Sequence, residues 1–170
     1  LDAPTTYGAP TTYGAPMVYS TLEKMPLILV VDDDESMLNF LQQILTEAGY
    51  RVIQAESGMK ALTVARQKHP DLIISDIVMP GQTGDSIDGF DVVSVLKGNA
   101  DTATIPIIIL SAIDERERGF RLGIDTYLTK PVEAEQVLEA VSGLLQREHP
   151  PDKNWPSAVA NGEVYDGQNR

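Results

Sequence analysis

The stretch LILVVDDDE, from Leu27 to Glu35, carries the strongest fold signal in the sequence. Its first five residues form a continuous apolar run, which is typical of a strand buried on both faces of a parallel sheet. Acidic residues follow at once, and Ser36 offers a helix N-cap. The apolar residues that then recur at helical spacing are Met37, Leu38, Leu41, Ile44, Leu45 and Ala48. Gly49 ends this helix, so the stretch predicts a strand, an acidic loop and a helix.

The same alternation continues along the chain. Further apolar runs predict strands over Arg51 to Ala55, Leu72 to Ile77, Ile105 to Leu110 and Thr126 to Leu128. Amphipathic stretches predict helices over Met59 to Lys68, Phe90 to Lys97, Glu115 to Leu122 and Glu133 to Gln146. Strands that alternate with helices indicate an α/β fold, a doubly wound sheet of five parallel strands with helices on both faces.

The two ends of the sequence differ from this central part. Residues 1–25 contain TTYGAP twice, at Thr5 to Pro10 and Thr11 to Pro16, and are too rich in Pro and Gly for a helix or a central strand. We expect a flexible leader over 1–25, one folded domain over 26–148 and a flexible tail over 149–170.

Composition excludes several classes of function. The formal net charge of −12 and the lack of a basic cluster argue against direct contact with nucleic acid. The chain has no Cys and two isolated His, so thiolate chemistry and a His-rich metal site are excluded. No apolar run approaches the roughly 20 residues that span a bilayer, and the first residues lack the basic-then-apolar order of a secretory signal. We therefore expect a cytoplasmic protein with no membrane insertion.

Polar residues end the predicted strands. They are Asp32 and Asp33, Asp76, Ser111 and Lys130. In an open parallel sheet the loops beyond the carboxyl ends of the strands converge, so these side chains should meet in one hollow. Crowded carboxylates require a cation, and oxygen-only ligands suit Mg²⁺. An Asp can attack phosphorus, and a metal together with a Lys can neutralise the charge on the phosphoryl group.

Four motifs at these strand ends resemble the response regulator receiver family of two-component signalling, in its single-domain, chemotaxis-type form. They are VVDD at Val30 to Asp33, SDIVMPG at Ser75 to Gly81, ILSA at Ile109 to Ala112 and YLTKP at Tyr127 to Pro131. The resemblance covers about Pro26 to Arg147 and implies a flavodoxin-like strand order 2-1-3-4-5. It also implies a phosphorylation switch rather than an enzyme, one that assists its own phosphotransfer and slow autodephosphorylation.

Site roles follow from the resemblance. Asp76 matches the phosphoacceptor, and the Mg²⁺ would be held by Asp76, by Asp33 directly, by Asp32 through water and by the backbone carbonyl of Val78.

The same resemblance assigns the remaining roles. Lys130 matches the lysine that contacts the phosphate, Ser111 the switch hydroxyl and Tyr127 the switch aromatic. Pro131 matches the proline that follows a cis peptide bond.

Two departures from the family pattern stand out. The segment Gly81 to Gly89 is about five residues longer than the family's loop. The segment from Ser111 to Lys130 is about three residues short, close to one helical turn. The shortening falls on the family's usual signalling face, so dimer and partner modes do not carry over directly. The same resemblance places Val78 and Ile113 beside the expected phosphate. Both are apolar and cannot hold a water by a hydrogen bond, which predicts a long-lived phosphorylated state.

The expected donor is a histidine kinase or a histidine phosphotransfer protein. No output domain follows residue 148 in this sequence, so we expect the signal to leave by contact with a downstream protein, with a phosphorylation-dependent dimer as a further possibility. One alternative is a haloacid-dehalogenase-like phosphatase, because Asp32, Asp34 and Ser36 also form a D-x-D-x-S run with Asp32 as the nucleophile. Another is a receiver-like interaction module that is not phosphorylated.

Overall fold

The computed structural model describes residues 25–79 and 87–148. The predicted leader, apart from Met25, the predicted tail and most of the extended loop Gly81 to Gly89 lie outside the described residues. The predictions made for those segments therefore remain predictions.

The centre of the structure is one parallel sheet. Its strands are β1 (Leu27–Val31), β2 (Arg51–Ala55), β3 (Leu72–Ser75), β4 (Ile107–Ser111) and β5 (Thr126–Thr129). Their order in the sheet is β2-β1-β3-β4-β5, and every neighbouring pair is parallel. This confirms the predicted fold class and strand order.

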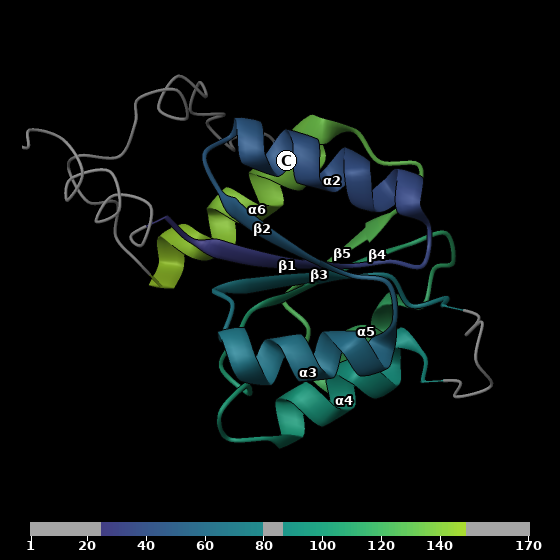
Figure 1. Cartoon of the computed structure of the whole chain (residues 1–170). Coiled ribbons are helices and arrows are strands. Elements are labelled where there is room, and N and C mark those ends of the chain that lie inside the picture. The colour runs from purple at the N-terminus through teal and green to yellow at the C-terminus, as the bar shows by residue number, and fades with distance from the viewer. Residues whose placement is uncertain (1–24, 80–86, 149–170) are drawn as a thin grey trace, which may run out of the picture.

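Helices cover both faces of the sheet (Figure 1). The helices on one face are α2 (Glu35–Glu47) and α6 (Ala134–Glu148), and those on the other are α3 (Gly58–Lys68), α4 (Gly89–Gly98) and α5 (Arg116–Leu122). None of the helices in the described ranges is long and apolar enough to cross a membrane.

The sheet has an apolar layer on each face because alternate residues of a strand point to opposite sides. In β1, Ile28 and Val30 pack with the α2 and α6 side chains, whereas Leu29 and Val31 pack with those of α3 and α4. Both faces of β1 are therefore buried, which explains why its sequence is continuously apolar rather than alternating.

Several element boundaries differ from the predictions by one or two residues, and three of the differences have a clear cause. The N-cap of α2 is Asp34 rather than Ser36, because the Asp34 carboxylate accepts the Ser36 N–H at 2.9 Å. The strand β3 ends at Ser75 rather than Ile77, because the Ile77 N–H bonds the Asp76 carboxylate instead of a neighbouring strand. The strand β4 begins at Ile107 rather than Ile105, since Pro106 has no N–H to donate to the sheet.

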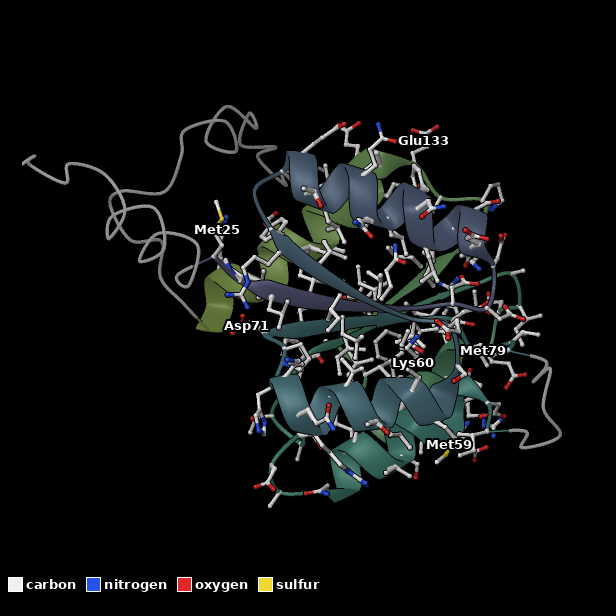
Figure 2. All side chains as sticks on the ribbon, viewed as in Figure 1. Met25, Met59, Lys60, Asp71, Met79 and Glu133 are labelled. Atoms are coloured by element: carbon white, nitrogen blue, oxygen red, sulfur yellow. The ribbon has the colours of Figure 1, made fainter. Side chains whose placement is uncertain are left out.

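The two ends of the sheet carry different groups. Figure 2 shows Met25 and Asp71 at one end and Met79 at the opposite end. At the first end, the Asp71 carboxylate accepts the N–H of Leu27 at 2.7 Å, and the Asp125 carboxylate accepts the N–H of Ile107 at 2.9 Å. These acids satisfy backbone donors at strand starts and are structural. The acids that remain for chemistry lie at the other end.

Candidate functional site

Two buried carboxylates and a lysine meet beyond the carboxyl ends of β1, β3 and β5. Asp32 follows β1, Asp76 follows β3 and Lys130 follows β5. Asp32 is 2% exposed and Asp76 is 6% exposed. The Lys130 ammonium donates to Asp32 Oδ2 at 2.7 Å and to Asp76 Oδ2 at 3.2 Å. Because buried carboxylates are costly unless paired, this one cation stabilises both.

Backbone amides hold the other oxygen of each carboxylate. Asp32 Oδ1 accepts the N–H of Asp34 at 2.9 Å. Asp76 Oδ1 accepts the N–H groups of Ile77 at 2.6 Å and Val78 at 3.2 Å. Each carboxylate is thus fixed by the turn that follows its own strand, with Oδ2 turned to Lys130.

Asp33 completes the acidic group. It is exposed, unlike Asp32 and Asp76, and one carboxylate oxygen from each of the three lies within 4.8 Å of the others. Partial burial and then the charges of Asp32 and Asp76 raise the pKa of Asp33 above its ordinary value. Crowded, oxygen-only and negatively charged donors are what Mg²⁺ prefers, so these residues fit the predicted ion.

The charge state of Lys130 is secured by its partners. Burial of its ammonium acts to lower the pKa, but the hydrogen bond that Lys130 donates to Asp32 and the negative charges of Asp76 and Asp32 outweigh this effect. The pKa of Lys130 is therefore raised, and the side chain stays cationic at neutral pH.

The predicted switch pair is connected through one residue. The buried Ser111 hydroxyl accepts the N–H of Ile113 at 3.4 Å. The Tyr127 hydroxyl donates to the Ile113 carbonyl and accepts the Glu115 N–H at 3.1 Å. Ser111 has no hydrogen bond to Asp76 in the part of the chain that the structure describes. Ser111, the last residue of β4, and Tyr127, in β5, thus both bond to the loop that follows β4.

The other predicted positions also lie at this end of the sheet. Val78 is 46% exposed and Ile113 is 39% exposed. Val78 lies in the loop after β3, and Ile113 lies in the loop after β4. The peptide bond between Lys130 and Pro131 is cis, as predicted. The Val78 carbonyl as a metal ligand stays a prediction.

Two hydrogen bonds to the backbone of Asp76 and Ile77 were not predicted from the sequence. The Ser75 hydroxyl donates to the Asp76 carbonyl at 3.0 Å. Gly89, the first residue of α4, donates its N–H to the Ile77 carbonyl at 2.9 Å. The sequence signal is a Gly directly before an apolar helix, which by itself predicts only the end of a loop.

A doubly wound sheet of this order, with acids after β1 and β3 and a lysine after β5, is the arrangement of a phosphoryl-accepting receiver domain. The chain belongs to the response regulator receiver domain family, which it matches over residues 28–142. Receiver domains are signalling components of two-component systems.

Several relatives are similar over most of this chain. The DNA-binding dual master transcriptional regulator RpaA of Synechocystis sp. is 40% identical over 143 residues, which is 82% of this chain and 56% of RpaA. Protein PilH of Pseudomonas aeruginosa is 37% identical over 124 residues, covering 71% of this chain and 98% of PilH. The chain thus spans about half the length of RpaA and nearly all of PilH.

Solved structures agree with the fold. A putative response regulator from Chloroflexus aurantiacus has a TM-score of 0.67 and 34% identity, covering 73% of this chain and all of that one (100%). The chemotaxis response regulator CheY4 of Vibrio cholerae has a TM-score of 0.65 and 30% identity, covering 71% and 99% of the two chains.

Proposed function

We propose that this protein is a phosphorylation-dependent switch that accepts a phosphoryl group on Asp76 from a phosphohistidine donor. The observation that carries the proposal is the convergence of Asp76, Asp32 and Lys130 at the ends of three strands, with Lys130 3.2 Å from Asp76 Oδ2. The exposed Asp33 beside them leaves the group accessible from solvent. The haloacid-dehalogenase-like alternative loses its support, because the chain belongs to the receiver family.

Each side chain has a defined part in the transfer. Oδ2 of Asp76 forms a bond to phosphorus while the bond from phosphorus to the imidazole nitrogen breaks, and the electron pair returns to the imidazole. Backbone amides hold Oδ1, which keeps the carboxylate oriented during the attack. Lys130 faces Oδ2 and neutralises the negative charge that arrives with the phosphoryl oxygens.

Asp33 and Asp76, with Asp32 through water and the Val78 carbonyl, would hold the Mg²⁺. When bound, the ion supplies positive charge to the phosphoryl oxygens. The ion would lie beside the attacking carboxylate of Asp76. Its positive charge would relieve the repulsion among the three acids.

Switching would follow from the added charge. A phosphoryl group brings about two negative charges and strong acceptor oxygens, toward which Ser111 and Lys130 would move. A shift of Ser111 would disturb its bond to Ile113, whose carbonyl accepts the Tyr127 hydroxyl. Tyr127 would then turn inward and change the surface that a partner meets.

The remaining parts of the proposal concern partners. The donor is a histidine kinase or a histidine phosphotransfer protein, and the output is contact with a downstream protein in the cytoplasm or a phosphorylation-dependent dimer. The net charge of −12 supports a chain that does not itself contact nucleic acid. The bound phosphoryl group would be lost slowly by autodephosphorylation.

Labelling with a radioactive small phosphodonor in Mg²⁺ tests the proposal. Wild type should be labelled and Asp76→Asn should not, whereas Asp101→Asn, a change at an exposed acid away from the site, should behave as wild type. Label that survives in Asp76→Asn but disappears in Asp32→Asn would support the phosphatase instead. No label on wild type from either a small donor or a phosphorylated kinase would favour an interaction module.

A further inference from the structure

We propose that Gly89 and Ser75 are positioning residues for the phosphoacceptor: both act on the carbonyl of Asp76, and through that peptide they orient the Asp76 carboxylate. The inference rests on the proposed role of Asp76. It assigns a function to the first residue of α4 and the last residue of β3, neither of which touches the reacting oxygen.

The space beside Gly89 is closed by backbone. A Cβ atom added to Gly89 would lie 2.1 Å from the Asp76 carbonyl oxygen, 2.6 Å from Ile77 Cα and 2.9 Å from the Asp76 carbonyl carbon. All three distances are far below van der Waals contact, and none of these atoms can rotate away as a side chain does. Any other residue at position 89 must therefore move the Asp76 peptide or the start of α4.

The start of α4 is held by its own capping contacts and by the core. Asp88 and Asp91 form a reciprocal capping box, with the Asp91 N–H donating to Asp88 at 2.8 Å and the Asp88 N–H donating to Asp91 at 3.1 Å. The next helical residue, Phe90, is 1% exposed and belongs to the apolar core. Asp76 is 6% exposed and its N–H donates to the Val31 carbonyl at 2.9 Å, but its carbonyl lies beyond the last residue of β3, in a turn that leads to the exposed Val78. The displacement should therefore fall on the Asp76 peptide.

Movement of this peptide reaches the carboxylate directly. The Asp76 carbonyl and the Ile77 N–H belong to one planar peptide group, so a tilt that moves the oxygen also moves the N–H. That N–H donates to Asp76 Oδ1 at 2.6 Å. This is the shorter of the two backbone hydrogen bonds that hold the carboxylate. Tilting it would turn Oδ2 away from Lys130.

Ser75 acts on the same oxygen from the strand side. It is 1% exposed, and its hydroxyl donates to the Asp76 carbonyl at 3.0 Å. The Asp76 carbonyl is thus held by a hydrogen bond from Ser75 while Gly89 leaves it room. The two residues define one orientation of the peptide from opposite ends of the loop.

Matched variants test the inference. Gly89→Ala is compared with Gly98→Ala, at the other end of the same helix, where an added Cβ meets nothing within 4 Å. Ser75→Ala is compared with Ser142→Ala, whose hydroxyl donates to the Glu139 carbonyl on α6, away from the site. The measurements are the phosphorylation rate with phosphoramidate in Mg²⁺, the melting temperature, and amide chemical shifts by NMR.

We expect Gly89→Ala to phosphorylate roughly 10- to 100-fold more slowly than Gly98→Ala, and Ser75→Ala several-fold more slowly than Ser142→Ala, because small misplacements of a reacting group are costly. The shift changes should centre on Asp76, Ile77 and Val78. In the double variant Gly89→Ala, Ser75→Ala, the two effects on the rate should be less than multiplicative, because both changes act on one carbonyl. A general loss of stability would not give this result.

A Gly89→Ala rate within about twofold of Gly98→Ala, in protein labelled at Asp76, overturns the inference and leaves the proposed function intact. Unshifted amides at 76–78 in Gly89→Ala overturn it equally. Should Gly89→Ala fail to fold, Ser75→Ala decides alone, and a wild-type rate there refutes the shared carbonyl. Wild type that is not labelled at Asp76 refutes the proposed function, and the inference with it.

Discussion

Replacing Lys130 with Met should destabilise the Mg²⁺-free protein far more than the loss of a surface ion pair. The change keeps the apolar stem of the side chain and removes the cation that pairs with Asp32 at 2.7 Å and with Asp76 at 3.2 Å. Both carboxylates are almost fully buried, and the Lys130 side chain is only 18% exposed. Their charges would then repel with no cation between them.

The size of the loss follows from this burial. Removing one partner of a buried ion pair typically costs about 3–5 kcal/mol. Here backbone amides still satisfy Oδ1 of both carboxylates, so we expect the lower end, about 3 kcal/mol. For a domain of this size that corresponds to a fall of roughly 10 °C in melting temperature.

Urea and thermal denaturation, followed by circular dichroism in EDTA, measure this loss. The control is Lys60→Met, which breaks an ion pair with Glu56 that is equally short, at 2.6 Å, but exposed. Its loss should be small, since water and salt screen exposed pairs. Adding Asp76→Asn to Lys130→Met should restore part of the stability by removing one of the buried charges. Equal losses in Lys130→Met and Lys60→Met would refute the argument that one cation stabilises the buried acids.

Three further predictions concern the phosphorylation cycle. Asp33→Ala should abolish Mg²⁺ binding in calorimetry, because the accessible carboxylate of the acidic group is lost, and unchanged affinity would count against the site. Ser111→Ala should still be phosphorylated but should bind its partner with a weaker response to phosphorylation, and equal affinity of the two phosphorylated proteins would contradict the coupling through Ile113. Val78→Asn should speed dephosphorylation by about tenfold, since a polar side chain at this exposed position can align a water. The decay of phosphorylated protein in Mg²⁺ without kinase measures this, and no acceleration would remove the prediction of a long-lived state.

The sequence determined the fold and the membership of the site because both depend on local pattern. Once the sheet is parallel, residues that end its strands must share one edge. The meeting of Asp32, Asp76 and Lys130 therefore follows without knowledge of any contact between them.

Tertiary structure decided what depends on distance between backbones. The position of the α2 N-cap, at Asp34 instead of Ser36, depends on which acceptor a backbone N–H reaches. The end of β3 at Ser75 depends on the same choice. In both places several possible acceptors lie within two residues of one another in the sequence. The role of Gly89 is the clearest case. Its backbone conformation is open to any residue, and only the approach of Asp76 from another part of the chain excludes a side chain there. A close approach between two backbones leaves no pattern in composition or periodicity, because it belongs to the packed molecule and not to either segment.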